Sequence, residues 1–157
     1  VVEYDWLTVI PKDKGLGGPR YLTIKPDENA SNPRNRLVED VYEPGSTFKS
    51  FMWAAALEAG VVRLDEVFDT GGGRWTTPYG RPIADVVRRG TQTWREVLVN
   101  SSNIGMVKGT SRLTFEQMRN AVTKFGFGSR TGIGLGGETA GIVTPMSRWT
   151  KYTQTSV

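Results

Sequence analysis

The 157-residue sequence contains no histidine and no cysteine. Without histidine, a Ser-His-Asp or Cys-His mechanism cannot be assembled within this chain. With neither residue, a zinc site would need carboxylate ligands alone, a set that zinc sites rarely use. We therefore expect no metal and no cofactor, and any serine chemistry must recruit another base, for which lysine is the leading candidate.

The sequence also lacks a signal peptide and any run of about 18 apolar residues that could cross a bilayer. Its charge is small, because 20 Lys plus Arg stand against 16 Asp plus Glu. The basic residues are scattered, so nucleic acid is not an expected partner. The chain begins at Val1 without methionine and ends at Val157 in a polar, β-branched run. We interpret it as a piece of a longer polypeptide.

The residue pattern predicts a helical cluster preceded by one or two strands. Strand-like residues occupy 1–10 and 21–24. After the breaker Glu43-Pro44-Gly45, Ser46 and Thr47 are predicted to cap an apolar helix that ends at Gly60.

Three further helices are predicted downstream. Capping boxes at Thr93-x-x-Glu96 and Thr114-x-x-Gln117 mark the beginnings of two of them, and the second ends at Phe125-Gly126. Between these two, a helix is expected to restart at Asn103, after an interruption.

Ser46 and Lys49 form the first candidate pair for chemistry. Residues three apart on a helix share a face, so the hydroxyl and the ammonium can meet. At a helix N-terminus, free backbone N–H groups would stabilise an oxyanion forming at Ser46. Burial in the apolar helix would lower the pKa of Lys49 toward that of a useful base. Taken alone, the S-x-x-K spacing also fits a capped helix with a solvated lysine.

Ser101-Ser102-Asn103 form the second candidate, at the predicted interruption between two helical stretches. The Ser101 hydroxyl can relay a proton. The Asn103 carboxamide can hold a substrate amide by accepting and donating at once. Taken alone, this segment also fits a polar, helix-breaking cap.

Together, the two motifs resemble those of penicillin-binding proteins, in which S-x-x-K and Ser-x-Asn occur as a pair. The flanking sequence agrees in three places: 42–49, 101–106 and 125–138. The resemblance covers roughly residues 35–157. It implies an α+β fold of the β-lactamase/transpeptidase type, present here mainly as its helical half with an incomplete antiparallel sheet.

The resemblance implies that residues 1–157 are one partial transpeptidase domain. Within it, 1–25 would supply sheet strands and 42–60 the nucleophile helix. The stretch 93–126 would be the helical region with the Ser-Ser-Asn loop, and 127–157 the start of the C-terminal part.

The activity implied by the resemblance is that of a serine-type D,D-transpeptidase, which cross-links peptidoglycan stem peptides. Ser46 would attack the penultimate D-Ala carbonyl and Lys49 would take its proton. Ser101 would pass a proton toward the leaving amine, and Asn103 would position the acyl-enzyme. Expected partners are D-Ala-D-Ala stem peptides, β-lactam antibiotics and other cell-wall synthesis proteins. The implied location is periplasmic or otherwise extracytoplasmic, with a membrane anchor in the full-length protein.

The family's third motif, a Lys-Thr-Gly strand, is absent from this sequence, and Lys108-Gly109-Thr110 has the same residues in another order. In the family this strand forms one wall of the cleft and supplies an oxyanion-hole N–H. Losing one such donor costs about 10²–10³ in rate. An inactive fragment or a scaffold domain of the same fold is therefore a competing interpretation.

Activities related to transpeptidation could use the same two motifs. A class A β-lactamase needs a glutamate that holds a water, and Glu138 is the nearby candidate, although its Gly-rich setting fits the transpeptidase family better. β-Lactam sensors and class D enzymes can carry Ser-Thr-Phe-Lys, but usually place valine at the position of Asn103. A D,D-carboxypeptidase differs only in using water as the acceptor.

Overall fold

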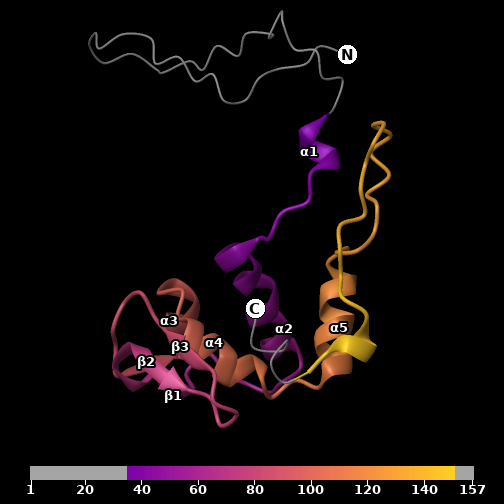
Figure 1. Ribbon diagram of the computed structural model, residues 1–157. Coiled ribbons are helices and arrows are strands. Elements are labelled where there is room, and N and C mark those ends of the chain that lie inside the picture. Colours follow the sequence, from indigo (N-terminus) through magenta and orange to yellow (C-terminus); the bar gives the residue numbers. More distant parts are fainter. Residues whose placement is uncertain (1–34, 151–157) are drawn as a thin grey trace, which may run out of the picture. The chain divides into compact units, whose positions relative to one another are not determined.

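The structure is a computed structural model, and it describes residues 35–150 (Figure 1). The strands predicted at 1–10 and 21–24 lie outside the described residues. Within the described part, no helix combines the length and the apolar character that a membrane crossing requires.

The chain divides into two compact units, each considered by itself. In the smaller one, residues 35–40 and 132–139 come together. It contains the short helix α1 (Arg36–Glu39), whose N-cap Asn35 accepts a hydrogen bond from the Leu37 amide. The Thr139 amide donates to the Val38 carbonyl at 2.9 Å, which ties the two segments of this unit to each other.

The larger unit, residues 41–131 and 140–150, carries the remaining helices and all the described strands. Its helices are α2 (Lys49–Glu58), α3 (Trp94–Val99), α4 (Asn103–Thr110) and α5 (Phe115–Lys124), with 3-10 turns η1 (Gly45–Phe48), η2 (Gly71–Gly73) and η3 (Met146–Arg148). Its strands are β1 (Val67–Asp69), β2 (Arg74–Thr76), β3 (Pro82–Ala84) and β4 (Thr91–Thr93).

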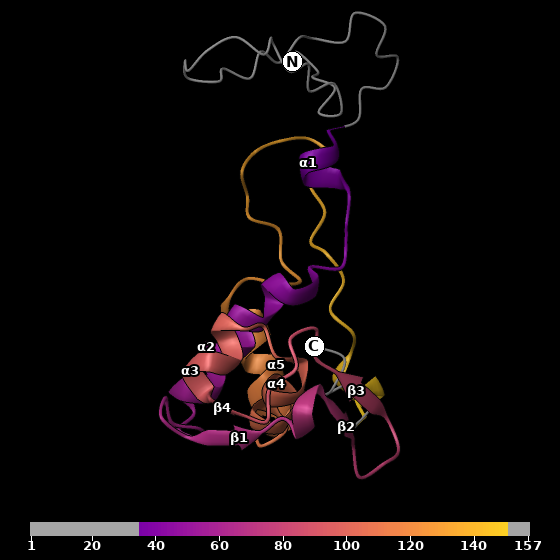
Figure 2. The ribbon, with the colours of Figure 1, turned by 90° about the vertical axis from the view of Figure 1, so that its left-hand side faces the viewer.

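The strands form two small antiparallel sheets. β1 pairs with β4, so that Phe68 lies opposite Gln92. β2 pairs with β3, so that Trp75 lies opposite Ile83. Figure 2 shows these strands along one edge of the helical cluster. The described residues therefore have a mixed α+β architecture, as predicted.

The core of the larger unit forms where α2, α4 and α5 pack against one another. Trp94, the first residue of α3, is fully buried at its centre. Its ring stacks on Trp53 of α2 at a centroid distance of 6.1 Å, and the Trp53 indole N–H donates to the Trp94 carbonyl at 2.8 Å. This packing fixes α2 and α3 against each other.

Most helix boundaries follow the predicted caps. Both capping boxes are present, with Thr93 and Glu96 at α3 and Thr114 and Gln117 at α5. Gly60 adopts a left-handed φ of 68°, and its amide and the following one bond back to the carbonyls of α2's last turn. The predicted restart at Asn103 is also confirmed, since α4 begins there and extends to Thr110.

Two details differ from the expectation. Ser46 and Thr47 do not cap α2 through their side chains, because Gly45, at φ 56°, already begins a 3-10 turn before the helix. The Thr47 hydroxyl instead donates to the Pro44 carbonyl. Strands β3 and β4 were not predicted, since three residues are too few for a pattern of period two to be evident.

Candidate active site

Ser46 and Lys49 lie at the turn that leads into α2. Ser46 is in the 3-10 turn η1 and its residue is exposed to solvent. Lys49 is the first residue of α2, and its backbone N–H donates to the Ser46 carbonyl. Its side chain runs inward and is only 3% exposed. One turn of helix thus separates an accessible hydroxyl from a buried amine.

The Lys49 ammonium binds three oxygen acceptors from the segment between α3 and α4. Its Nζ donates to the Ser101 carbonyl at 2.7 Å, to Ser101 Oγ at 3.0 Å and to Asn103 Oδ1 at 2.5 Å. An ammonium group has three N–H donors, so each one has an acceptor. The structure therefore brings together three of the four predicted site residues at one atom.

The fourth predicted residue, Ser46, is near this group in the chain but is not bonded to it. Among the hydrogen bonds of residues 35–150, none joins Ser46 Oγ to Lys49 Nζ. For Lys49 to accept the Ser46 proton, its nitrogen must be neutral and must give up one of its present contacts. In the described arrangement the Lys49 amine is bonded to Ser101 and Asn103 instead of Ser46.

The turn between α3 and α4 gives Ser101 its position. Ser101 has a φ of 52°, which makes it the one described non-glycine residue in the left-handed region. This conformation points both its carbonyl and its hydroxyl at Lys49 Nζ. Asn100 closes α3 and Ser102 is the N-cap of α4, so Ser101 is the single residue that reverses the chain between them.

Asn103 is held by both ends of its carboxamide. Its Oδ1 accepts from Lys49 and its Nδ2 donates to the Ala84 carbonyl at 2.7 Å. The second contact links the first residue of α4 to the last residue of β3. Binding of a substrate amide by Asn103 would require exchange of one of these partners.

Asp85 is a site residue that sequence analysis did not single out. It follows β3, is 9% exposed, and binds the start of α4 through both carboxylate oxygens. Oδ2 accepts from Ser102 Oγ at 2.6 Å and Oδ1 accepts from the Ile104 amide at 3.0 Å. The available signal was a lone aspartate within an otherwise apolar Ile-Ala-Asp-Val-Val segment, but no spacing rule connects it with a loop so far along the chain.

Burial and charge act on Lys49 in opposite directions. Desolvation lowers the pKa of Lys49 below its ordinary value, as the sequence predicted, and the negative charge of Asp85 raises it in part. The net direction is downward. Lys49 is therefore neutral over a wider pH range than an exposed lysine.

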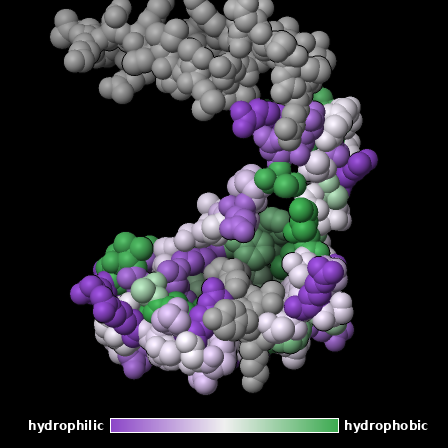
Figure 3. All heavy atoms as spheres, viewed as in Figure 1, coloured by the Kyte–Doolittle hydropathy of each residue, from purple (hydrophilic) through white to green (hydrophobic). Residues whose placement is uncertain are grey.

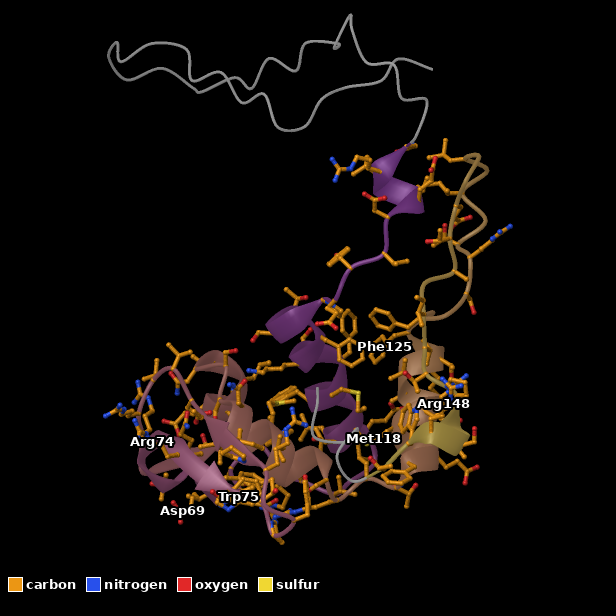
Figure 4. All side chains as sticks on the ribbon, in the orientation of Figure 1. Asp69, Arg74, Trp75, Met118, Phe125 and Arg148 are labelled. Carbon is orange, nitrogen blue, oxygen red and sulfur yellow. The ribbon has the colours of Figure 1, made fainter. Side chains whose placement is uncertain are left out.

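Aromatic side chains gather close to the same turn. Phe48, which directly precedes Lys49, lies 5.1 Å from the ring of Phe127, and Phe51 lies 4.9 Å from that of Phe125. Figure 4 places Phe125 beside the N-terminal part of α2. Figure 3, seen from the same direction, shows hydrophobic atoms gathered there. These contacts brace the η1 turn and the beginning of α2 against the residues at the end of α5.

An exposed serine hydroxyl one turn from an amine of lowered pKa is an arrangement that can support nucleophilic acyl transfer. The comparisons with known proteins agree with this class. A model of the penicillin binding protein transpeptidase domain matches residues 17–157. The chain therefore belongs to the family of penicillin-binding protein transpeptidase domains.

Curated relatives support the same family. The chain is similar to the peptidoglycan D,D-transpeptidase FtsI of Escherichia coli, with 38% identity over 119 residues that make up 74% of this chain and 19% of the relative. It is also similar to the stage V sporulation protein D of Bacillus subtilis, with 42% identity over 73% of this chain and 18% of the relative. The chain thus spans about a fifth of the length of these two relatives.

A solved structure extends the agreement to the fold. The transpeptidase domain of penicillin-binding protein 3 from Burkholderia pseudomallei superposes with a TM-score of 0.74 at 36% sequence identity. The match covers 79% of this chain and 37% of that one. The fold of the described residues is therefore that of part of a transpeptidase domain.

Proposed function

We propose that this chain contributes the acyl-serine half of a D,D-transpeptidase active site that cross-links peptidoglycan stem peptides. The observation that carries this proposal is the convergence of two distant motifs on one buried amine. Lys49 Nζ contacts Ser101 and Asn103, which lie 52 and 54 residues further along the chain. A scaffold has no need of a buried lysine at this cost in desolvation.

In the proposed first half-reaction, Ser46 Oγ attacks the penultimate D-Ala carbonyl and its proton passes to neutral Lys49 Nζ. The amide bond to the terminal D-Ala then breaks. The leaving nitrogen receives a proton from Lys49 by way of the Ser101 hydroxyl, and a Ser46 ester remains. Asn103 exchanges an internal partner for the substrate amide and holds the acyl group in place.

In the second half-reaction, an amine of another stem peptide attacks the ester carbonyl. A new amide bond forms, the Ser46–acyl bond breaks, and the proton given up by the attacking amine passes to Ser46 Oγ. A carboxypeptidase would differ only by using water at this step. A β-lactam would follow the first half-reaction alone, because its opened ring leaves Ser46 acylated.

We propose that this activity lies outside the cytoplasmic membrane, where peptidoglycan is built, and the family membership supports this location. We propose that residues 1–157 are part of one transpeptidase domain of a membrane-anchored protein. Other cell-wall synthesis proteins are its expected partners. The family's Lys-Thr-Gly strand, absent from the sequence, would complete the cleft and the oxyanion hole.

The test is acylation by benzylpenicillin, followed by intact mass spectrometry. We expect an adduct of one drug molecule on the wild-type chain and none on Ser46→Ala. Exposed Ser50, also on the nucleophile helix, provides the matched control, and Ser50→Ala should acylate like the wild type. The same measurement is repeated with the chain extended through a Lys-Thr-Gly strand. A folded, extended protein that forms no Ser46 adduct would refute the proposed function.

A further inference from the structure

The Ser-Ser-Asn segment needs support from neighbouring residues to keep its conformation. Ser101 adopts the left-handed region, which costs an L residue roughly 1–2 kcal/mol relative to ordinary conformations. A free loop would relax away from this conformation, and the Ser101 contacts with Lys49 would be lost. Neighbouring structure must therefore restrain the segment.

The residues that restrain the segment are Ala84 and Asp85, at the end of β3. Asp85 binds Ser102 Oγ at 2.6 Å and the Ile104 amide at 3.0 Å, one on each side of Asn103 in the sequence. The Ala84 carbonyl accepts from Asn103 Nδ2 at 2.7 Å. Three consecutive residues at the start of α4 are thus attached to the last residue of β3 and to the residue that follows it.

The two Asp85 contacts are buried and are linked to a further hydrogen bond of Ser102. Ser102 is 1% exposed, and while its hydroxyl donates to Asp85 it accepts from the Gly105 amide at 2.9 Å. Two of the free amides at the N-terminus of α4 are thereby satisfied, one by Asp85 directly and one through Ser102. Charge-assisted hydrogen bonds of this kind are about twice as strong as neutral ones.

We propose that Asp85 is a positioning residue of the active site: by binding Ser102 and Ile104 at the N-terminus of α4, it holds Ser101 and Asn103 against Lys49. The inference rests on the proposed function only where acylation is the readout. Asp85 touches neither Ser46 nor Lys49 through a hydrogen bond of the described residues, so it acts through the segment that it binds.

Asp85 also has an electrostatic effect that can be separated from its geometric one. It is the charged group that acts on Lys49 within the described part of the chain, and it opposes the lowering of the pKa of Lys49 by burial. Asp85→Asn keeps an acceptor oxygen for Ile104 but removes the charge. Asp85→Ala removes both. The two substitutions therefore differ in a predictable way.

The experiment compares Asp85→Asn and Asp85→Ala with the wild type and with Asp69→Asn as a matched control. Asp69 lies at the end of β1, and its carboxylate accepts a hydrogen bond from the Gly71 amide at 2.8 Å. Asp69 thus resembles Asp85 in its contact with a backbone amide, but it is exposed. The readouts are amide hydrogen exchange at Ile104, an NMR titration of the Lys49 side chain, and the rate of benzylpenicillin acylation against pH.

We expect Asp85→Ala to speed exchange at Ile104 and to slow acylation, each by about 10- to 100-fold, the range for loss of hydrogen bonds to a charged group. Asp85→Asn should change the exchange rate at Ile104 and the acylation rate by less, because it keeps an acceptor oxygen for the Ile104 amide. Because it removes the charge that raises the pKa of Lys49, its Lys49 titration should move to lower pH. Since neutral Lys49 is the base, the acid limb of acylation should move to lower pH as well.

The inference is overturned if both Asp85 variants match Asp69→Asn in Ile104 exchange and in Lys49 titration. Should Asp85→Ala fail to fold, Asp85→Asn still decides the outcome through its exchange rate and its titration. If a folded protein extended through a Lys-Thr-Gly strand is not acylated either, the proposed function fails. Exchange and titration would then still test the positioning role of Asp85 independently.

Discussion

Ser101 shows how one strained residue can organise a site. Its φ of 52° lets a single residue present both a carbonyl and a hydroxyl to Lys49 Nζ, at 2.7 Å and 3.0 Å. Ser101 thus supplies two of the three contacts of Lys49 Nζ from a backbone conformation that costs an L residue free energy.

The cost can be measured by replacing Ser101 with alanine and with glycine. Both substitutions remove the hydroxyl, so they differ only in backbone freedom. A left-handed conformation costs alanine roughly 1–2 kcal/mol, whereas glycine loses roughly 0.5–1 kcal/mol more conformational entropy on folding. We therefore expect Ser101→Gly to have the higher free energy of unfolding, by about 0.5–1 kcal/mol, in urea denaturation.

Ser111, with φ −64° at the end of α4, provides the control for this comparison. There glycine has no conformational advantage, so Ser111→Gly should be less stable than Ser111→Ala. The same order of stability at both positions would mean that Ser101 is not strained.

The roles of Lys49 and Asp85 were not equally predictable from the sequence. The lowered pKa of Lys49 followed from its place in an apolar helix, because burial always disfavours the charged form. The role of Asp85 did not follow, because its partners Ser102 and Ile104 lie 17 and 19 residues away. No local rule of spacing relates an aspartate after a short strand to a helix N-terminus.

Helix α4 packs closely in the core because it has a glycine where it contacts a large side chain. Gly109 faces the six-membered ring of Trp94, and a Cβ atom there would collide with ring atoms Cζ3 and Cη2. Trp94 is fully buried, so its ring has no room to move aside. The Lys108-Gly109-Thr110 segment therefore has a packing role here, one that does not depend on its likeness in composition to the family's third motif.

Gly109→Ala should destabilise the protein, although alanine normally favours helices by about 1 kcal/mol. Overpacking typically costs about 1–3 kcal/mol, and we expect a loss in the upper part of this range, since the obstacle is a buried ring. Gly90→Ala is the control, because nothing lies within 4 Å of its Cβ position. Urea denaturation of both variants measures the difference, and equal stabilities would contradict the packing of Trp94 on Gly109.

Local sequence predicted helices much better than strands in this molecule. The caps of α3 and α5 depend on contacts between residues three apart, and both were recognised from the sequence. β3 and β4 are three residues long and are defined by their pairing, with the neighbouring β2 and the more distant β1 respectively. Their existence depends on pairing, which composition alone does not reveal.

The larger unit is held together by contacts between segments that are far apart in the chain. Phe51 on the nucleophile helix lies 5.1 Å from Phe127 and 4.9 Å from Phe125, both edge-to-face. Through these rings the end of α5 supports the turn that carries Ser46. Stability of the fold and the placement of the nucleophile are thus linked.

A double-mutant cycle measures this link. Phe51→Leu and Phe127→Leu preserve most apolar burial but remove the edge-to-face contact. We expect a coupling free energy of about 0.5–1.5 kcal/mol between them. The control cycle pairs Phe51→Leu with Phe115→Leu, whose ring contacts Trp149 instead. That cycle should be additive within about 0.5 kcal/mol. Additivity in both cycles would show that the aromatic contact does not support the nucleophile helix.

The sequence determined the chemical groups and the helices that carry them. Ser46, Lys49, Ser101 and Asn103 could be named because S-x-x-K and Ser-x-Asn are short local motifs that together resemble those of penicillin-binding proteins. Only the tertiary structure decided how those groups meet. It directs Lys49 to Ser101 and Asn103, leaves Ser46 unbonded to it, and adds Asp85 from beyond a strand. The physical reason is that burial and long-range hydrogen bonds depend on which segments become neighbours, and this is a property of the folded chain.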